Sequence, residues 1–228
     1  MGTIVSSPAT GGLRRRQWAL FALVLLLVGA LGTAALIATR KEAPKPQSSL
    51  PIGGASASGQ GSLISPPRTL TNFTMTSHRG TPLSLGELRG KAVLLFFGYT
   101  RCPDFCPTTL VEFRDVKRAL GTEAAGVAFV FVSVDAESDT AETLGQYVTN
   151  FDPEFIGLRG DAATLAQIGP EYDLYFKKRE VSGATGYLID HTAITYLIDR
   201  EGRLRIIFPY GTPASAIATD IHALLAQP

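Results

Sequence analysis

The sequence has few of the residues that carry metal and redox chemistry, and this scarcity narrows the possible functions. Its 228 residues include two cysteines, three histidines, two methionines and one tryptophan. Two cysteines are too few for a disulfide-stapled scaffold, and a chain of this length needs none to build a core. Because the two cysteines stand close together, they indicate redox chemistry or metal binding.

Charge is scarce as well. Charged residues make up 18% of the chain, below the usual quarter, and the formal net charge is +1. Nothing in this balance favours a nucleic acid or an acidic substrate as partner. The apolar excess is local, since most of it lies in one segment near the N-terminus.

That segment, Trp18 to Ala38, contains no charged residue. As a helix it is about 30 Å long, which matches the hydrocarbon core of a bilayer. It is longer than the roughly 7–15-residue apolar region of a signal peptide, so we expect an uncleaved transmembrane anchor at residues 17–39. A signal peptide with a cleavage site among its small residues is the alternative, and it would export the domain to the same compartment.

Basic residues on both sides of the segment bear on its orientation. Arg14, Arg15 and Arg16 precede it and favour a cytoplasmic tail at residues 1–16. Basic residues on the far side nearly balance them. The expected localisation is the cell membrane, with the C-terminal domain on the extracytoplasmic face, periplasmic or outer.

Residues 40–66 are rich in proline, glycine, serine and alanine and poor in large apolar residues. Such a composition cannot bury a core and predicts a flexible linker. The globular domain is then expected at residues 67–228.

Within this domain, apolar runs alternate with helical patterns. The expected strands are a hairpin around 77–80, then 91–97, 127–134, 155–158, and a second hairpin of 193–198 and 204–208. The first expected helix is opened by Pro103 or Pro107 and ended by Gly121. Further helices are expected at 140–150, capped by Ser138 or Asp139, at 162–168, capped by Asp161, and at 214–226. Parallel βαβ units followed by an antiparallel hairpin predict an α/β fold, a mixed sheet with helices on both faces.

Both cysteines, Cys102 and Cys106, lie where the first long strand meets its helix, and sites in open α/β sheets lie at the carboxyl ends of strands. On the first turns of a helix they would share one face, about 6 Å apart, within reach of a disulfide. The helix N-terminus and Arg101 would lower the thiol pKa values, so both sulfurs are expected to be reactive and solvent-reachable. A purely structural disulfide is disfavoured, because so short a loop removes little entropy from the unfolded chain.

A metal site needs a third ligand, and three histidines are available. His78 in a hairpin turn and His222 in the last helix are interpreted as surface residues. His191, just before the last apolar hairpin, can be a ligand or an ordinary loop residue. A Cys₂His set suits Cu(I), while zinc stays possible and a dithiol redox pair needs no histidine. The pattern alone leaves these alternatives open.

Three segments decide the matter by resemblance: FFGYTRCPDFCPTTL, VFVSVDAESDTAETLGQYVTNFDPEFIGLRG and YLIDHTAITYLID. In sequence and order they resemble the Sco/SenC family, over residues 67 to 228. The resemblance implies a thioredoxin-like fold, a membrane tether, and copper bound as Cu(I) or Cu(II) by two cysteines and a histidine. It also implies assembly of the dinuclear copper centre of cytochrome c oxidase.

By this resemblance, Cys102, Cys106 and His191 are the copper ligands. Asp135 matches an acidic position near the metal, and Ala136 follows it where the family usually has proline. Alternatively, Asp135 only caps a turn. Asp104 and Arg101 are further candidates for tuning the charge of the site.

The implied role is a metallochaperone, which is not an enzyme. Its expected partners are the copper-receiving subunit of the oxidase, a copper donor and a thiol reductant that the sequence does not name, and the membrane. The alternative is a thiol–disulfide oxidoreductase that reduces the cysteines of the same subunit through a redox-active Cys102–Cys106 disulfide, without His191. A zinc hydrolase and a peroxidase are less well supported, because the sequence offers neither an obvious general base nor a peroxidase cysteine motif.

Overall fold

The computed structural model describes residues 50–181 and 186–227. The predicted tail, the predicted anchor and residues 40–49 of the predicted linker lie outside the described residues. Among the described residues, no helix is long and apolar enough to cross a bilayer.

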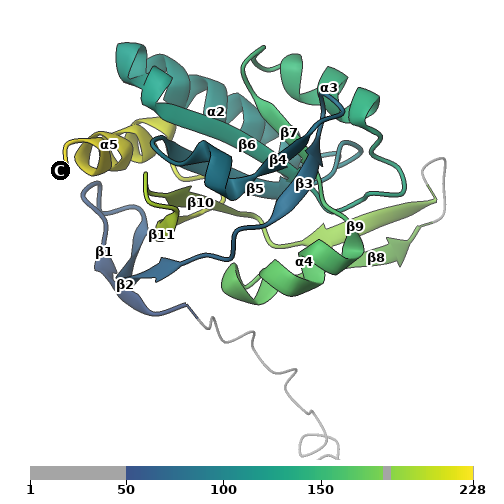
Figure 1. The fold of residues 1–228 in the computed structure, drawn as a ribbon, viewed down its shortest axis with the longest axis horizontal. Helices are drawn as coiled ribbons and strands as arrows, with labels where there is room; N and C mark the ends of the chain where they lie inside the picture. Colours follow the sequence, from purple (N-terminus) through teal and green to yellow (C-terminus); the bar gives the residue numbers. More distant parts are fainter. Residues whose placement is uncertain (1–49, 182–185, 228) are drawn as a thin grey trace, which may run out of the picture. The chain divides into compact units, whose positions relative to one another are not determined.

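A nine-stranded mixed sheet forms the centre of the domain (Figure 1). Its strand order is β1-β2-β11-β10-β5-β6-β7-β3-β4, in which β5, β6 and β7 run parallel and the other neighbours pair antiparallel. The strands are β1 (Ile52–Ala55), β2 (Ser62–Thr69), β3 (Thr74–Ser77), β4 (Pro82–Ser84), β5 (Ala92–Gly98), β6 (Val127–Ser133), β7 (Ile156–Arg159), β10 (Ile194–Ile198) and β11 (Arg203–Pro209). The predicted mixed sheet and its two hairpins are confirmed.

Helices cover both faces of this sheet. Figure 1 shows α2 and α5 packed together on one face, with α3 toward the same side and α4 on the opposite face. The helices are α2 (Phe105–Leu120), α3 (Ala141–Thr149), α4 (Ala162–Ile168) and α5 (Ala214–Leu225), with short 3₁₀ turns η1 (Leu85–Leu88), η2 (Gly121–Gly126) and η3 (Gly169–Glu171). Every residue of β5 and β6 is buried, as expected of strands covered on both faces.

The helix ends follow local chemistry. Gly121 ends α2 with a positive φ of 55°, and the side chain of Asp161 caps α4, both as predicted. The cap of α3 is Thr140, which accepts from the N–H of Thr143; the prediction of Ser138 or Asp139 is wrong. Asp139 is unavailable because its carboxylate is buried and bonded elsewhere.

The sheet begins earlier than the composition predicts. β1 and β2 occupy part of the expected linker, and Ile64 of β2 is buried in the core. The carboxylate of Asp220 on α5 accepts from Ser56 Oγ at 2.6 Å and from the N–H of Ser58 at 2.6 Å, which fixes the turn between these strands. Residues 50–66 are therefore part of the domain. Their small side chains suit an edge hairpin held by backbone pairing rather than by bulk.

A second, two-stranded sheet was not predicted. It consists of β8 (Phe176–Glu180) and β9 (Tyr187–His191), which pair antiparallel with each other. Every residue of β8 is exposed and four of its five residues are charged, so its sequence resembles a loop. His191 is the last residue of β9, and the expectation that it lies in a loop is corrected.

Candidate metal centre

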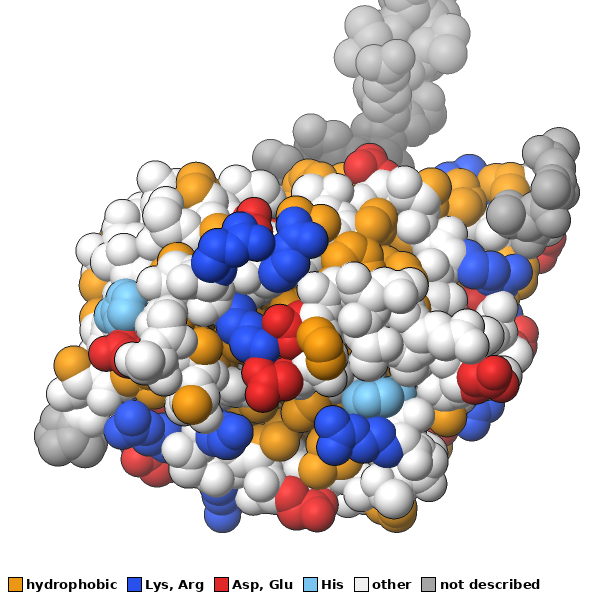
Figure 2. All heavy atoms as spheres, turned by 90° about the horizontal axis from the view of Figure 1, so that it is seen from above, with side chains coloured by type: hydrophobic (Ala, Val, Ile, Leu, Met, Phe, Trp, Pro, Cys, Tyr) orange, Lys and Arg blue, Asp and Glu red, His pale blue; other side chains and the backbone are white. Residues whose placement is uncertain are grey.

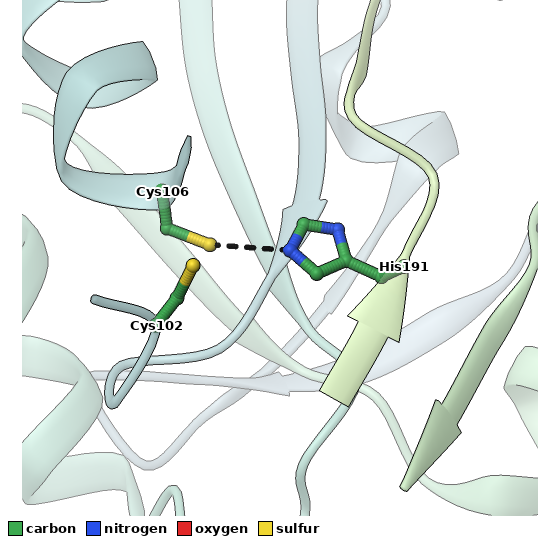
Figure 3. A group of neighbouring side chains, drawn as sticks. All are labelled: Cys102, Cys106 and His191. Carbon is green, nitrogen blue, oxygen red and sulfur yellow. Dashed lines mark hydrogen bonds between the residues drawn. The ribbon is translucent and has the colours of Figure 1, made fainter. Parts of the chain in front are cut away.

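The structure brings together the three residues that the sequence proposes as ligands. The Sγ atoms of Cys102 and Cys106 and a ring nitrogen of His191 lie within 4.8 Å of one another (Figure 3). Cys106 Sγ is 3.6 Å from His191 Nε2. The other two histidines are elsewhere: His78 Nδ1 accepts from the N–H of Gly157, and exposed His222 contacts Glu123.

The two cysteines come from different local structures. Helix α2 begins at Phe105, so Cys106 is in its first turn, whereas Cys102 lies in the preceding turn and donates its N–H to the carbonyl of Tyr99. The condition that both cysteines lie on the first turns of the helix is therefore met by Cys106 and not by Cys102. Pro107 is in the first turn of α2, where a proline is tolerated because its missing N–H has no partner there.

Gly98, the last residue of β5, makes room for one sulfur. A Cβ atom at this position would lie 2.6 Å from Cys106 Sγ and 2.8 Å from the ring of Phe131. Neither distance is tolerable, so Cys106 can occupy its place only because residue 98 has no side chain. This explains the glycine in FFGYTRC in terms of the site itself.

The two sulfurs differ in exposure and in acidity. Cys106 is fully buried and Cys102 is 8% exposed, so the expectation that both are solvent-reachable is wrong for Cys106. A hydrogen bond from Cys106 lowers the pKa of Cys102 to about 3 against the effect of burial, helped by His191 and by the N–H groups of Asp104 and Cys106. Burial raises the pKa of Cys106, as do its hydrogen bond to Cys102 and the neighbouring thiolate charge. At neutral pH the pair is therefore one thiolate, on Cys102, and one thiol.

The ring of His191 is held in an orientation suited to a ligand. Its Nδ1 is 3.1 Å from the carbonyl oxygen of Thr192, which can only accept, so Nδ1 carries a proton and Nε2 is the nitrogen that faces the sulfurs. The rings of Phe96 and Tyr99 pack against the imidazole in T-shaped arrangements, with centroid distances of 5.9 and 5.8 Å. Fixing the far nitrogen of a histidine in this way is usual at metal sites.

The spacing of the donor atoms fits a soft metal ion. Metal–ligand bonds of about 2.3 Å to sulfur and 2.0 Å to nitrogen, the values for zinc, put the two donors about 3.5–3.7 Å apart at tetrahedral to trigonal angles. The 3.6 Å between Cys106 Sγ and His191 Nε2 falls in this range. Two thiolates and an imidazole favour copper or zinc over magnesium or calcium.

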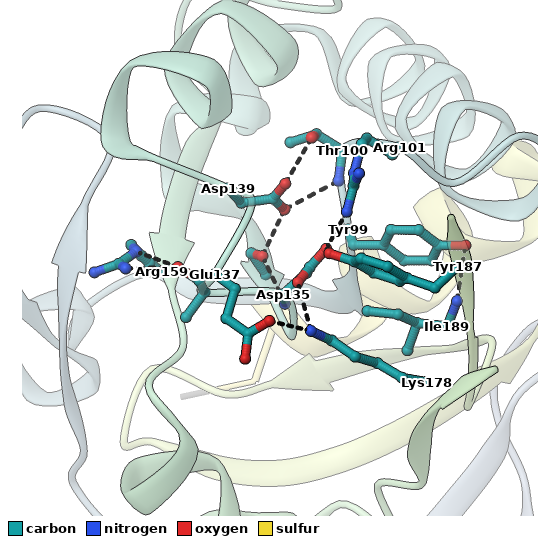
Figure 4. A network of polar contacts seen from close by, with 12 residues as sticks. Tyr99, Thr100, Arg101, Asp135, Glu137, Asp139, Arg159, Lys178, Tyr187 and Ile189 are labelled. Carbon is teal, nitrogen blue, oxygen red and sulfur yellow. Dashed lines mark hydrogen bonds and ion pairs between the residues drawn. The ribbon is translucent and has the colours of Figure 1, made fainter. Parts of the chain in front are cut away.

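The remaining candidates lie outside the ligand set. The buried carboxylate of Asp135 pairs with Arg101 at 3.1 Å and accepts from the Tyr187 hydroxyl at 2.7 Å (Figure 4). Arg101 is therefore already engaged. The side chain of Asp104 stands at the N-cap of α2 and makes no capping hydrogen bond.

The sequence did not identify Tyr187 or Lys178 as residues near the site. It also gave no role to Tyr99, whose hydroxyl accepts from the N–H of Ile189. One signal was available: in YLIDH, alternate residues share one face of a strand, which puts Tyr187 on the face of His191.

A mixed sheet with helices on both faces, carrying a dithiol and a histidine at the carboxyl end of its central strand, defines a thioredoxin-like protein with a redox or soft-metal site. Comparison with known proteins is more specific. The chain belongs to the SCO1/SenC family, whose model matches residues 62–226.

The chain is 32% identical over 223 residues to the mitochondrial SCO2 homolog of Bos taurus, covering 96% of this chain and 78% of that protein. It is 33% identical over 132 residues to an SCO2-like protein of Rickettsia prowazekii, covering 58% of this chain and 64% of that protein, less than two thirds of its length. Among solved structures it resembles ScoI of Bradyrhizobium japonicum with copper bound, at 40% identity and a TM-score of 0.63, covering 68% of this chain and 99% of that one.

Proposed function

We propose that the protein is a membrane-anchored metallochaperone that binds copper through Cys102, Cys106 and His191. The target would be the dinuclear copper centre of cytochrome c oxidase, as membership of the SCO1/SenC family implies. The observation that carries the proposal is the convergence of three soft donor atoms within 4.8 Å. It is supported by the 40% identity to a ScoI protein whose structure contains copper.

The geometry suits a cargo that must be held and then released. Cys102 is ready as a thiolate, Cys106 gives up its proton when the metal binds, and His191 directs Nε2 toward the sulfurs. Three protein ligands leave one position at which a thiolate of the target can enter, so the ion can pass by ligand exchange. Two thiolates with Cu(I) leave a net charge near −1. Arg101 cannot fully offset that charge because it is paired with Asp135.

The anchor and the location remain part of the proposal. Residues 17–39 would span the cell membrane and place the domain on its extracytoplasmic face. The partners would then be the copper-receiving subunit of the oxidase, a copper donor and a reductant in that compartment.

A second candidate function is favoured by the unequal thiols. A thiol–disulfide oxidoreductase needs one low-pKa sulfur to attack and a second to resolve, and Cys102 and Cys106 have these properties. Neither forms a disulfide in the structure. In this function Cys102 would reduce the cysteines of the target subunit, and His191 would be dispensable.

Metal titration of the full chain tests the first function. We expect the reduced protein to bind one equivalent of Cu(I), Cys102→Ser and Cys106→Ser each to abolish binding, and the surface variant His222→Ala to bind normally. Stoichiometric binding with unchanged affinity in Cys102→Ser would reject the proposal.

Oxidase assembly in cells that carry single variants separates the two functions. The chaperone predicts loss of assembly in both His191→Ala and Cys106→Ser. If His191→Ala supports assembly and Cys106→Ser does not, the reductase is the correct function.

A further inference from the structure

A buried carboxylate links the cysteine turn to the strands that carry His191. The side chain of Asp135, just after β6, is fully buried. Its Oδ2 pairs with Arg101, the residue before Cys102, at 3.1 Å, and accepts from the hydroxyl of Tyr187 on β9 at 2.7 Å. Within the part of the chain that the structure describes, its Oδ1 has no hydrogen bond, and Lys178 Nζ of β8 lies 3.8 Å away.

Two cations converge on the ring of Tyr187 (Figure 4). The guanidinium carbon of Arg101 is 4.4 Å from the ring centroid, and Lys178 Nζ is 4.5 Å from it. Both distances are within the range of a cation–π interaction. One tyrosine therefore contacts the cysteine turn, the end of β6 and strand β8 at once, by its ring and its hydroxyl.

The β8–β9 hairpin needs such an attachment. Among the described residues its two strands pair only with each other, and an isolated two-stranded hairpin is marginally stable in water. Besides Tyr187, the contacts that hold it include the buried side chain of Ile189, the hydrogen bond from the Ile189 N–H to Tyr99, the ion pair of Lys178 with Glu137, and the packing of the His191 ring against Phe96 and Tyr99. The position of His191 therefore depends on how the hairpin is held.

Strand geometry connects Tyr187 to His191. In β9, residues 187, 189 and 191 point to the same face because strand side chains alternate. Tyr187 reaches Asp135, and His191, four residues on, reaches Cys106 at 3.6 Å. A change in the angle of β9 at Tyr187 would move the imidazole relative to the sulfurs.

We propose that Tyr187 is the positioning residue for His191: held by Asp135, Arg101 and Lys178, it sets the distance of the imidazole from the two sulfurs. The inference rests on the proposed copper function and deepens it. The network that places the third ligand touches neither sulfur. The contact between His191 and the metal can therefore be weakened while both cysteines stay in place. Partners that hold ligands in place at other metal sites contribute about 10- to 100-fold in affinity.

A double-mutant cycle on the full chain tests this. Cu(I) affinity is measured by competition with a chromophoric chelator for the wild type, Tyr187→Ala, His191→Ala and the double variant. We expect Tyr187→Ala to lose about tenfold in affinity, and His191→Ala, which removes the ligand itself, to lose at least as much. The double variant should bind within threefold of His191→Ala, because Tyr187 acts through the histidine.

Two further variants guard against a simple folding defect. Tyr187→Phe keeps the ring and its cation contacts but removes the hydrogen bond to Asp135, and should lose about threefold in affinity. Tyr175→Ala, at an exposed tyrosine just before β8, should bind as the wild type does. Circular dichroism shows that each variant is folded at the temperature of the titration.

Failure of this inference can be distinguished from failure of the proposed copper function. If His191→Ala loses affinity while Tyr187→Ala and Tyr187→Phe do not, the positioning role is rejected and the copper site stands. If the losses of the two single variants multiply in the double variant, Tyr187 acts independently of the histidine, and the inference is also rejected. If the wild type binds no Cu(I), the proposed function fails and the inference with it.

Discussion

The carboxylate of Asp139 is bound by Thr100, which donates its hydroxyl at 2.6 Å and its N–H at 3.0 Å. Ser133, the last residue of β6, donates to the same carboxylate at 2.6 Å. Asp139 is completely buried, so this one side chain joins the turn before the cysteines to the end of β6. An acidic residue that the sequence suggested as a helix cap is instead a support of the metal centre.

Replacing this carboxylate should destabilise the domain. In Asp139→Ala, the hydroxyls of Thr100 and Ser133 and one backbone N–H lose a charged acceptor in a buried site. We expect the free energy of unfolding to fall by about 3 kcal/mol, measured by urea denaturation. The matched control is Asp104→Ala, since that aspartate is exposed and caps nothing; it should change stability by less than about 0.5 kcal/mol. Equal effects of the two variants would contradict this assignment.

Adding one methyl group at Gly98 should disrupt the metal centre. The new Cβ would lie 2.6 Å from Cys106 Sγ, so the sulfur or the end of β5 must move. We expect Gly98→Ala to lose about 1–3 kcal/mol of stability and at least tenfold in Cu(I) affinity. The control, Gly126→Ala, places its Cβ 3.9 Å from Leu225, which is an ordinary contact. It should keep both the stability and the Cu(I) affinity of the wild type. Unchanged copper affinity in Gly98→Ala would show that the space beside Cys106 Sγ accommodates a methyl group at position 98.

The low pKa of Cys102 predicts an unusual pH profile for alkylation. Because its folded pKa is about 3, below that of an ordinary thiol, the thiolate is fully formed from about pH 5 upward. The rate of modification by iodoacetamide, followed by mass spectrometry, should therefore be flat between about pH 5 and 8 and fall only below about pH 4. Cys106, buried and with a raised pKa, should react later.

The variant Cys106→Ala supplies the control for this profile. It removes the hydrogen bond that contributes most to lowering the pKa of Cys102. The pH at which the rate reaches half its maximum should then rise. A wild-type rate that climbs tenfold per pH unit up to about pH 8.5 would be that of an ordinary thiol and would contradict the prediction.

The N-terminal hairpin should depend on Asp220. Its carboxylate accepts from Ser56 Oγ and from the N–H and Oγ of Ser58, at 2.6, 2.6 and 2.7 Å. Asp220→Ala should lower the free energy of unfolding by about 2–3 kcal/mol and open the turn between β1 and β2 to proteases, detected as cleavage within residues 56–61. Ser215→Ala, at an exposed position of the same helix, should do neither. Protease resistance equal to that of the wild type would show that the hairpin is held by backbone pairing alone.

The sequence predicted strands and helix caps correctly where a single kind of interaction determines them. The runs in β5 and β6 are apolar because both faces are covered, and Asp161 caps α4 through a contact three residues away. β1 and β8 were missed for opposite reasons. β1 is too small in its side chains and β8 too charged to show a strand pattern, since both are exposed and depend on pairing with a neighbour.

In the candidate site too, the local features could be predicted from the sequence and the tertiary contacts could not. The spacing of Cys102 and Cys106 indicates a pair but does not say that α2 starts between them, or that Gly98 buries one sulfur. That Tyr187 would reach Asp135, 52 residues earlier in the chain, depends on tertiary packing that no local pattern encodes.

If the protein is anchored as proposed, the early start of the sheet limits how far the domain can move from the membrane. If the anchor ends at residue 39 as proposed, residues 40–49 join it to the first described residue, and a fully extended chain of that length spans at most about 35 Å. A linker reaching to residue 66 would span about 95 Å. Under the proposed anchoring, the shorter linker would keep the domain closer to the bilayer and so raise the effective concentration of a membrane-embedded acceptor. Lengthening the linker should therefore lower the rate of delivery without changing the affinity for the metal.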